Sequence, residues 1–455
     1  MKMTSIEQRA VASLATIMSL RMIGLFMALP IFSLYALKLP GATPTLIGLA
    51  MGIYGLTQAI FQIPFGVLSD RFGRKPIIGL GLIIFIIGSL TCSFAHSIIA
   101  VIIGRSLQGA GAVGSTILAM MADLTREEKR TISMAIAGVT IGLSFAIAMF
   151  LGPTLTQWVS LSGLFFISAL FGVAALILLF TITPTPTTLR WHQDTEPEFK
   201  SFFKLLIFPE LAKLNIGIFI LHAVFTASFV VIPIGLAHLG IAAHYQWKLY
   251  LPILLVAFTI SLICINRAER QHQLKFYFLV GIVLLAIAEI SLWIAANNVI
   301  VTAVSLGLFF SGFSLLEAFL PSLISRTAPL ARKGSALGVY SCAQFLGIFV
   351  GGLSGGWLFG KFGFSSVYLF CLCLTLLWLI FACLMQPPRY LITRVLRLSP
   401  LQQAHWEINI TNLRTIPGMV EVSLLAEDKI VYLKMEPKSL QHPDFIRLKE
   451  LLQSE

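Results

Sequence analysis

The ionisable or strongly polar side chains that lie inside long apolar segments of the chain include Arg21, Arg105, Gln108, His222 and Glu317. A charged group is costly in such surroundings, so each of these residues is a candidate functional residue. A carboxyl or an imidazole can take up and release a proton, and an arginine can bind an anionic group. These residue types indicate a protein that binds and releases protons or binds charged groups.

Glu317 is the leading candidate for a proton carrier. Ser314 lies one turn before it and Pro321 one turn after it. The alternative is that Glu317 forms a structural ion pair with an arginine. The other embedded carboxyl is Glu289, which lies one turn before Trp293.

The basic members of the set also have structural alternatives. Arg21 either binds an anionic group or neutralises Glu317. Arg105 and Gln108 are three positions apart and share one helix face, and Arg105 is either functional or tied to backbone carbonyls. His222 is either a proton relay or a hydrogen-bonding group between helices.

The composition places these residues in a membrane protein. Of the 455 residues, 57% are hydrophobic and 11% are charged, whereas a soluble domain is about 25% charged. The apolar residues form blocks long enough to span a bilayer. No cluster of His, Asp, Glu or Cys has the spacing of a metal or nucleophile site, and no phosphate-binding loop occurs. The sequence therefore predicts neither an enzyme nor a metal or nucleotide cofactor.

Twelve apolar blocks predict an all-α membrane bundle. The blocks lie near 12–37, 44–67, 76–95, 98–122, 131–155, 163–183, 213–237, 247–265, 275–295, 299–324, 334–359 and 364–386. The start of the fifth block, Lys129 to Ala135, is echoed by Arg332 to Gly338, 203 positions later. We therefore expect two pseudo-repeated six-helix bundles, 1–183 and 213–386, with a linker at 184–212 and a site between the halves.

The positive charges predict the orientation. The net charge is +12, and the lysines and arginines between the blocks divide 18 to 3 between alternate sides. The three on the minority side are Lys38, Lys248 and Lys361. This positive-inside pattern predicts cytoplasmic termini and argues against a nucleic-acid partner.

Residues 387–455 differ from the rest, with 9 Lys and Arg and 8 Asp and Glu between 389 and 455. Alternation predicts strands near 390–398, 420–425 and 430–435, and helical periodicity occurs near 401–416 and 443–452. This order predicts a small α+β domain of ferredoxin-like type. Ligand or lipid-headgroup binding, self-association and control of transport are its open roles.

A charged decapeptide follows the second block and reads Gly66-Val67-Leu68-Ser69-Asp70-Arg71-Phe72-Gly73-Arg74-Lys75. Gly66 permits close backbone approach, and Asp70 suits the positive N-terminal end of a neighbouring helix. Arg71 and Arg74 can bridge to carboxylates at other helix ends. A turn that only obeys the topology rule is the alternative, but that rule does not require Asp70.

The decapeptide resembles the loop 2–3 signature of the major facilitator superfamily, and the resemblance covers the twelve-block region. It implies that this loop latches the two halves in the outward-facing state, with Asp70 against the helix opening at Lys333-Gly334. It also implies that Arg71 or Arg74 pairs with Asp123. Because the ninth helix is peripheral in that family, the resemblance makes Glu289 a weaker candidate than Glu317 and places it toward the outer interface beside Trp293.

The fifth block resembles the antiporter signature of that family. Gly142, Gly152 and Pro153 match it, whereas Ala148 replaces an expected glycine and Thr156-Gln157 replace the terminal glycine pair. The match supports an exporter, and a helix kinked by Pro153 and packed through small residues is the structural alternative.

Two further matches refine the resemblance. Arg105 and Gln108 resemble the R-x-x-Q-G motif of the fourth helix. The segment 316–323, with 338–340 and 344–347, resembles the YajR-type branch, whose members also end in a ferredoxin-like domain.

The resemblance implies a multi-pass inner-membrane transporter that is powered by the proton gradient and uses no cofactor. Its expected partners are a small, amphipathic substrate, protons and membrane lipid. Proton-coupled export is the leading hypothesis, and uptake by symport is the alternative. A membrane sensor that signals through the C-terminal domain is the alternative from another class.

Overall fold

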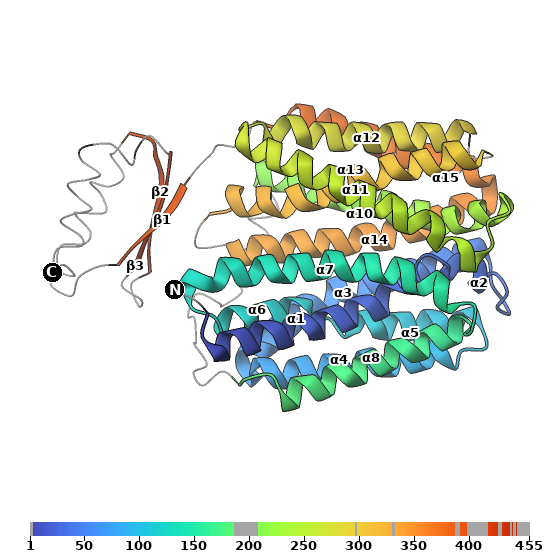
Figure 1. Ribbon diagram of the computed structural model, residues 1–455, viewed down its shortest axis with the longest axis horizontal. Coiled ribbons are helices and arrows are strands. Elements are labelled where there is room, and N and C mark those ends of the chain that lie inside the picture. The colour runs from blue at the N-terminus through green and yellow to red at the C-terminus, as the bar shows by residue number, and fades with distance from the viewer. Residues whose placement is uncertain are drawn as a thin grey trace.

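The computed structural model describes residues 3–185, 208–295, 298–329, 333–386, 392–397, 417–425 and 430–436, together with residues 439 and 443. In this part of the chain, twelve helical segments are long and apolar enough to cross a membrane. They lie side by side along the long dimension of the molecule (Figure 1). The predicted number of spans is confirmed.

The helices form two sets that correspond to the predicted halves. The first half comprises α1 (Ser5–Phe26), α2 (Phe32–Ala36), α3 (Pro44–Phe72), α4 (Arg74–Ser93), α5 (Ile98–Ala110), α6 (Gly114–Asp123), α7 (Glu127–Leu155) and α8 (Leu161–Thr181). The second half comprises α10 (Pro209–His238), the 3-10 turn η2 (Ala243–Tyr245), α11 (Trp247–Arg270), α12 (Leu274–Ala295), α13 (Val299–Thr327), α14 (Lys333–Phe362) and α15 (Phe364–Cys383). Most of the predicted linker lies outside the described residues.

Local sequence signals set several helix ends. The side chains of Thr43, Ser97 and Asn298 cap α3, α5 and α13 by accepting hydrogen bonds from backbone N–H groups of the first turn. Gly73 and Gly363 separate consecutive helices with φ of 91° and 80°, a region that suits glycine. These residues explain why long apolar stretches divide where they do.

Two spans are less regular than the sequence predicts. The block near 98–122 is divided into α5 and α6, and the block near 12–37 is divided into α1 and α2. In the first case Gly111 leaves helical geometry, and its carbonyl accepts a hydrogen bond from Arg21 Nη2 at 3.1 Å. An added Cβ at Gly111 would lie 2.4 Å from Gly81 O, so close packing on α4 also favours glycine at the break.

The two halves pack tightly through α3 and α14. A Cβ added at Gly48 would lie 2.1 Å from Gly352 O, and one at Gly55 would lie 2.5 Å from Phe345 O. The backbones therefore touch, as small residues permit between membrane helices. These contacts occupy the part of α3 that begins at Pro44 and extends to its middle, where Cys342 Sγ lies 3.6 Å from Ala59 O.

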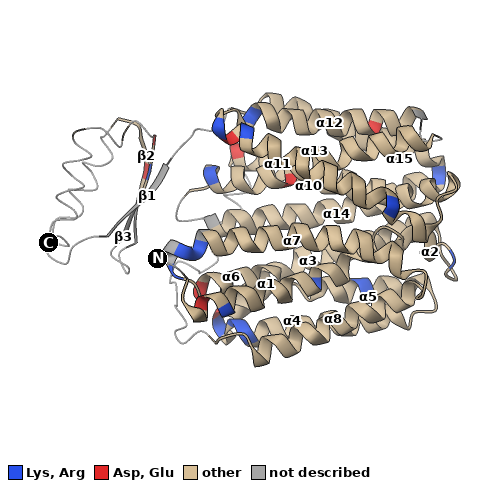
Figure 2. Cartoon of the chain, in the orientation of Figure 1, with Lys and Arg blue, Asp and Glu red and all other residues tan. Residues whose placement is uncertain are grey.

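One end of the bundle is rich in charged residues, and we call it the basic end. It is the end at which α1 begins, and Figure 2 shows the lysines and arginines gathered there. By the bounds of α3, α4, α7, α11, α12 and α13, its described basic residues include Arg71, Arg74, Lys75, Arg126, Arg267, Arg270, Lys275 and Arg326. The tight contacts between α3 and α14 lie toward the opposite end.

A small antiparallel sheet follows the bundle, and Figure 1 places it beyond the basic end. Its strands are β1 (Ile392–Arg397), β2 (Met419–Leu425) and β3 (Ile430–Met435), in the order β1-β3-β2. The three predicted strands are confirmed, and their order is that of a split βαβ unit. The two predicted helices of this domain lie outside the described residues, so its ferredoxin-like fold stays a prediction.

Candidate functional site

The second half places Glu317 in a hydrogen-bonded cluster formed by α10, α13 and α14. Gln344 Nε2 lies 2.8 Å from His222 Nε2 and 3.3 Å from Glu317 Oε1. Because an amide nitrogen only donates, both His222 Nε2 and the Glu317 carboxyl act as acceptors in this arrangement. Glu317 Oε2 lies 3.8 Å from His222 Nε2, and 39% of the Glu317 side chain is exposed.

Aromatic rings flank this cluster. The rings of His222 and Phe313 have centroids 5.7 Å apart, and Phe313 stacks on Phe225 at 4.7 Å. Tyr340, one turn before Gln344 on α14, has a buried hydroxyl with no hydrogen-bond partner among the described residues. The cluster thus presents a carboxyl, an imidazole, an amide and a phenol within mostly apolar walls.

The first half contains the two buried arginines, which lie in separate environments. The Arg105 guanidinium lies over the Tyr54 ring at 4.4 Å and donates to Ala50 O and to Gln108 Oε1. Gln108 in turn donates to Ser89 Oγ at 2.9 Å. Arg105 is therefore tied to one carbonyl and to the side chain predicted to share its face.

Arg21 is 1% exposed and lies between α1, α3 and the break after α5. Its Nη2 donates to Gly111 O and to Gln58 Oε1, at 3.1 and 3.3 Å, while its Nε and Nη1 have no partner among the described residues. The predicted neutralisation of Glu317 by Arg21 is absent from the described ion pairs. Each residue is instead held by groups of its own half.

The charged decapeptide is not a loop, because α3 continues to Phe72 and α4 begins at Arg74, which leaves only Gly73 between the helices. Its contacts are organised around Arg74. This side chain pairs with Asp70 and with Asp123 at the end of α6, the latter at 3.0 Å, and it also donates to Ser69. The pairing of Arg74 with Asp123 agrees with what the family resemblance implied. Lys75 donates to Thr183 O beyond the end of α8, and Arg71 is exposed.

The predicted close approach at Gly66 is absent. A Cβ added at Gly66 would meet no described atom within 4 Å, and the same is true at Gly334 near the start of α14. The reason is that the close contacts between α3 and α14 are confined to the parts of both helices that lie away from the basic end. The contact between Asp70 and the start of α14 stays a prediction of the resemblance.

The antiporter-like glycines of α7 have unequal surroundings. An added Cβ at Gly152 would lie 2.1 Å from Met27 O, so α7 packs closely on the end of α1. Pro153 lies inside α7, and Ala148 is fully buried. Gly142 has no described atom within 4 Å of such a Cβ, so packing explains Gly152 and leaves Gly142 without a contact to explain it.

Glu289 is more enclosed than the sequence predicts. It is 0% exposed, whereas Trp293 is 42% exposed on the same helix. Ser228 Oγ donates to Glu289 Oε1 at 3.0 Å and lies 3.5 Å from Cys371 Sγ. The carboxyl therefore joins α12 to α10 and α15 within the second half.

Sequence reasoning missed several partners of the predicted residues. Gln58 and Tyr54 contact the arginines, and Ser89 accepts a hydrogen bond from Gln108. Gln344 joins His222 to Glu317. A glutamine inside an apolar helix is an unusual polar residue and therefore a candidate for a functional contact. Gln58 and Gln344 could both have been identified from the sequence on that ground. Among the described residues, no group of three or more His, Cys, Asp or Glu is arranged to hold a metal ion.

Two pseudo-repeated membrane bundles with polar groups facing their interior define a polytopic transporter fold. A sequence model of the major facilitator superfamily matches residues 14–270. The inner membrane transport protein YajR of Escherichia coli is 42% identical over 437 residues, which cover 96% of each chain. The chain belongs to the major facilitator superfamily and is a YajR-like, multi-pass membrane transporter.

Two further likenesses are more distant. Multidrug resistance protein 3 of Bacillus subtilis is 26% identical over 309 residues, which cover 67% of this chain and 52% of that one. The crystal structure of a D-xylose-proton symporter matches with a TM-score of 0.67 at 17% identity, covering 84% of this chain and 98% of that one. This second likeness supports the fold alone.

Proposed function

We propose that this chain is a proton-coupled secondary transporter of the inner membrane that exports a small, amphipathic molecule by alternating access. The basic end faces the cytoplasm, following the positive-inside rule. The observation that carries the proposal is the Gln344 bridge between His222 and Glu317, because both bridged groups are titratable and both accept from one amide.

Protonation changes this bridge in a defined way. When His222 Nε2 carries a proton, it becomes a donor and can no longer accept a hydrogen bond from the Gln344 amide. When Glu317 is protonated, the acceptor that Gln344 binds loses its charge. Either event weakens the hold of α10 or α13 on α14. Because α14 packs directly on α3 of the first half, the protonation state of the cluster is coupled to the contact between the halves.

The packing between the halves supports alternation. Contacts near Gly48 and Gly55 hold α3 and α14 together away from the basic end, whereas Gly66 and Gly334 have no close described neighbours. We assign this arrangement to the state that is open to the cytoplasm. Closing the basic end brings Asp70, in the last turns of α3, toward the start of α14, which is the latch contact of the outward-facing state.

Export is favoured over uptake by α7 and by the Bacillus relative. Gly152 and Pro153 keep the Gly-Pro pair of the antiporter signature, and the relative is named for multidrug resistance. The departure at Ala148 favours uptake by symport as the second candidate. The direction of substrate-dependent proton movement in vesicles of known orientation discriminates these two functions.

The proposal is tested in liposomes that contain a pH-sensitive dye, with a panel of amphipathic compounds. The wild-type protein is expected to move protons in response to at least one compound, and Glu317→Gln is expected to abolish that movement while the protein stays folded. Glu269→Gln, at the basic end, is the matched control and retains coupling. Full coupling in Glu317→Gln would show that another group carries the proton.

A further inference from the structure

Lys434 in β3 is an unusual residue, because a lysine is 6% exposed in the middle strand of a small sheet. Lysines are rarely buried unless the ammonium group has a partner. Lys434 Nζ lies 3.2 Å from Ala328 O and donates to it. Ala328 is fully buried and directly follows α13, so the contact joins the sheet to the membrane bundle.

The carbonyl that Lys434 contacts is a natural site for a cation. Ala328 is the C-cap of α13, with φ of −61° and ψ of 144°, so the chain leaves helical geometry there. The last carbonyls of a helix lack partners within the helix and form the negative end of its dipole. The ammonium group thus meets an acceptor and a favourable field at the same point.

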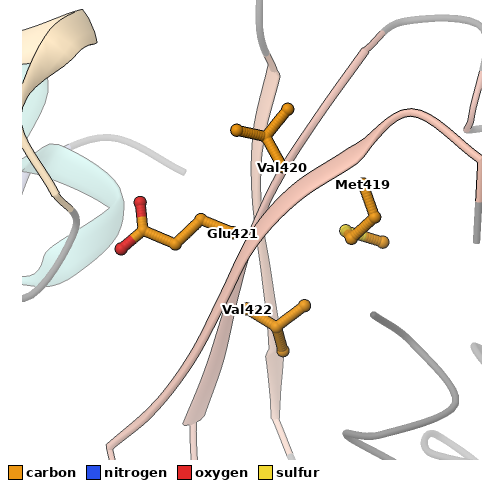
Figure 3. Close-up of a pocket in the computed structure, with 4 residues that line it drawn as sticks. All are labelled: Met419, Val420, Glu421 and Val422. Carbon is orange, nitrogen blue, oxygen red and sulfur yellow. The ribbon is translucent and has the colours of Figure 1, made fainter. Parts of the chain in front are cut away.

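The two faces of the sheet carry different kinds of residue. Leu433 and Met435 flank Lys434 and are fully buried, and they alternate with it to the other face. Glu421 of β2 is the register partner of Lys434, so an acid and a base lie side by side on one face. Figure 3 shows Met419, Val420, Glu421 and Val422 around a hollow beside β2, with Glu421 pointing to the side on which helices of the bundle appear.

The end of α15, from which the chain leads toward the sheet, is held in place. Lys275, near the start of α12, donates to Cys383 O and Met385 O at 2.9 and 2.5 Å, which holds the end of α15. The six chain steps from Gln386 to Ile392, where β1 begins, reach at most about 22 Å. The sheet therefore cannot move far from the second half, and its attachment there is pre-organised by the short connection.

From these contacts we propose that the C-terminal sheet docks on the basic end of the second half through the face that carries Lys434 and Glu421. The ammonium of Lys434 on the Ala328 carbonyl is the anchor of this interface. The sheet then moves with α13 as one body. Its partner is this chain's own bundle, in preference to a second copy or a lipid surface.

The test measures a distance by spin labelling the full-length protein, in a background where the exposed Cys373 and Cys383 are replaced by serine. One label is attached at Val420→Cys in the sheet and the other at Arg270→Cys at the end of α11. Both positions are exposed. The expected result is one narrow distance peak, which Lys434→Met abolishes and Lys434→Arg retains. Lys213→Met, which removes a lysine of the basic end paired with Glu210, is the matched control and leaves the peak unchanged.

A second label pair, Val420→Cys with Glu436→Cys, reports whether the sheet itself stays folded. Lys434→Gln is compared in the same way, and the proposal is judged on whichever variant retains this second distance. A broad first distance in the parent protein overturns the proposal, as does a narrow peak that survives the loss of Lys434. A peak that disappears on dilution with unlabelled protein also overturns it, because it shows docking between copies. These distances need no substrate, so they are independent of proton coupling.

Discussion

Asp123 and Arg326 occupy equivalent positions in the two halves and carry opposite charges. Arg326 follows Asp123 by the same 203 positions that separate the repeated segments, and each residue lies at the basic end of its helix. Asp123 pairs with Arg74, which follows the second span of its half, and Arg326 pairs with Glu269, which ends the second span of the other half. The repeat has therefore kept the bridge and reversed its polarity.

This reversal predicts that the bridge in the first half tolerates a charge exchange. Asp123→Arg is expected to lower stability by about 0.2–1 kcal/mol, because both partners are partly exposed and the new charge faces Arg74. Adding Arg74→Glu should recover part of that loss. Recovery is incomplete because Arg74 also pairs with Asp70. Thermal unfolding of the single and double variants in detergent measures it, and an additive loss would contradict a simple bridging role.

Glycines at the two ends of α3 are predicted to act on different conformations. Gly48→Ala places a Cβ 2.1 Å from Gly352 O, so the backbones must separate, at a cost of about 1–3 kcal/mol to the present arrangement. In Gly66→Ala the added methyl group meets no described atom in the present conformation. It is expected to destabilise the conformation in which the basic end is closed. Labels at the two ends should report opposite shifts in population.

Gly138→Ala is the control for this pair, because it lies in α7 with no described atom within 4 Å of the added methyl group. It is expected to be neutral or to stabilise the helix by about 0.5–1 kcal/mol. Equal shifts from Gly48→Ala and Gly66→Ala would contradict the assignment of one conformation to each glycine.

The sequence predicted the elements far better than the contacts between them. The spanning blocks and the three strands follow from local patterns, and they are present. The charged decapeptide was expected as a loop, but α3 continues to Phe72 and α4 begins at Arg74, so only Gly73 lies outside a helix. The break at Gly111 was missed because it depends on Arg21 and on packing against Gly81, which lie far away in sequence. The burial of Glu289 was missed for a similar reason, because Ser228 belongs to another helix.

Arg105 is predicted to stabilise the first half and to hold the side chain of Gln108 in position. Arg105→Lys retains the charge but cannot stack as a plane on Tyr54 while donating to Ala50 O and Gln108, so about 1–3 kcal/mol of stability should be lost. If the residue is only structural, Arg105→Lys lowers the unfolding temperature and leaves the substrate-to-proton ratio unchanged. A changed ratio at normal stability shows a direct part in transport.

Gln344 is predicted to carry the coupling between His222 and Glu317. Gln344→Met preserves the length of the side chain and removes the donor, so proton movement should become independent of substrate. The residue is half-buried, which makes a large loss of stability unexpected. Cys342→Ala on the same helix is the control. Unaltered coupling in Gln344→Met would contradict the proposed bridge.

Glu289 is predicted to stabilise the second half and to take no part in the transport cycle. Its carboxyl is fully buried and accepts from Ser228, while its other oxygen has no partner among the described residues. An unpaired carboxylate is costly to bury, so the neutral form fits this site, and Glu289→Gln should preserve both folding and proton coupling.

Glu289→Ala separates this role from an ionic one. It removes the acceptor for Ser228 and leaves a cavity between α10, α12 and α15, so a loss of about 2–5 kcal/mol is expected. Ser228→Ala in the same protein should then add little, because the two residues form one hydrogen bond. Thermal unfolding and dye-based proton flux are measured on all three variants. Loss of coupling in Glu289→Gln at normal stability would make this carboxyl a second proton carrier, which the enclosed position beside Ser228 argues against.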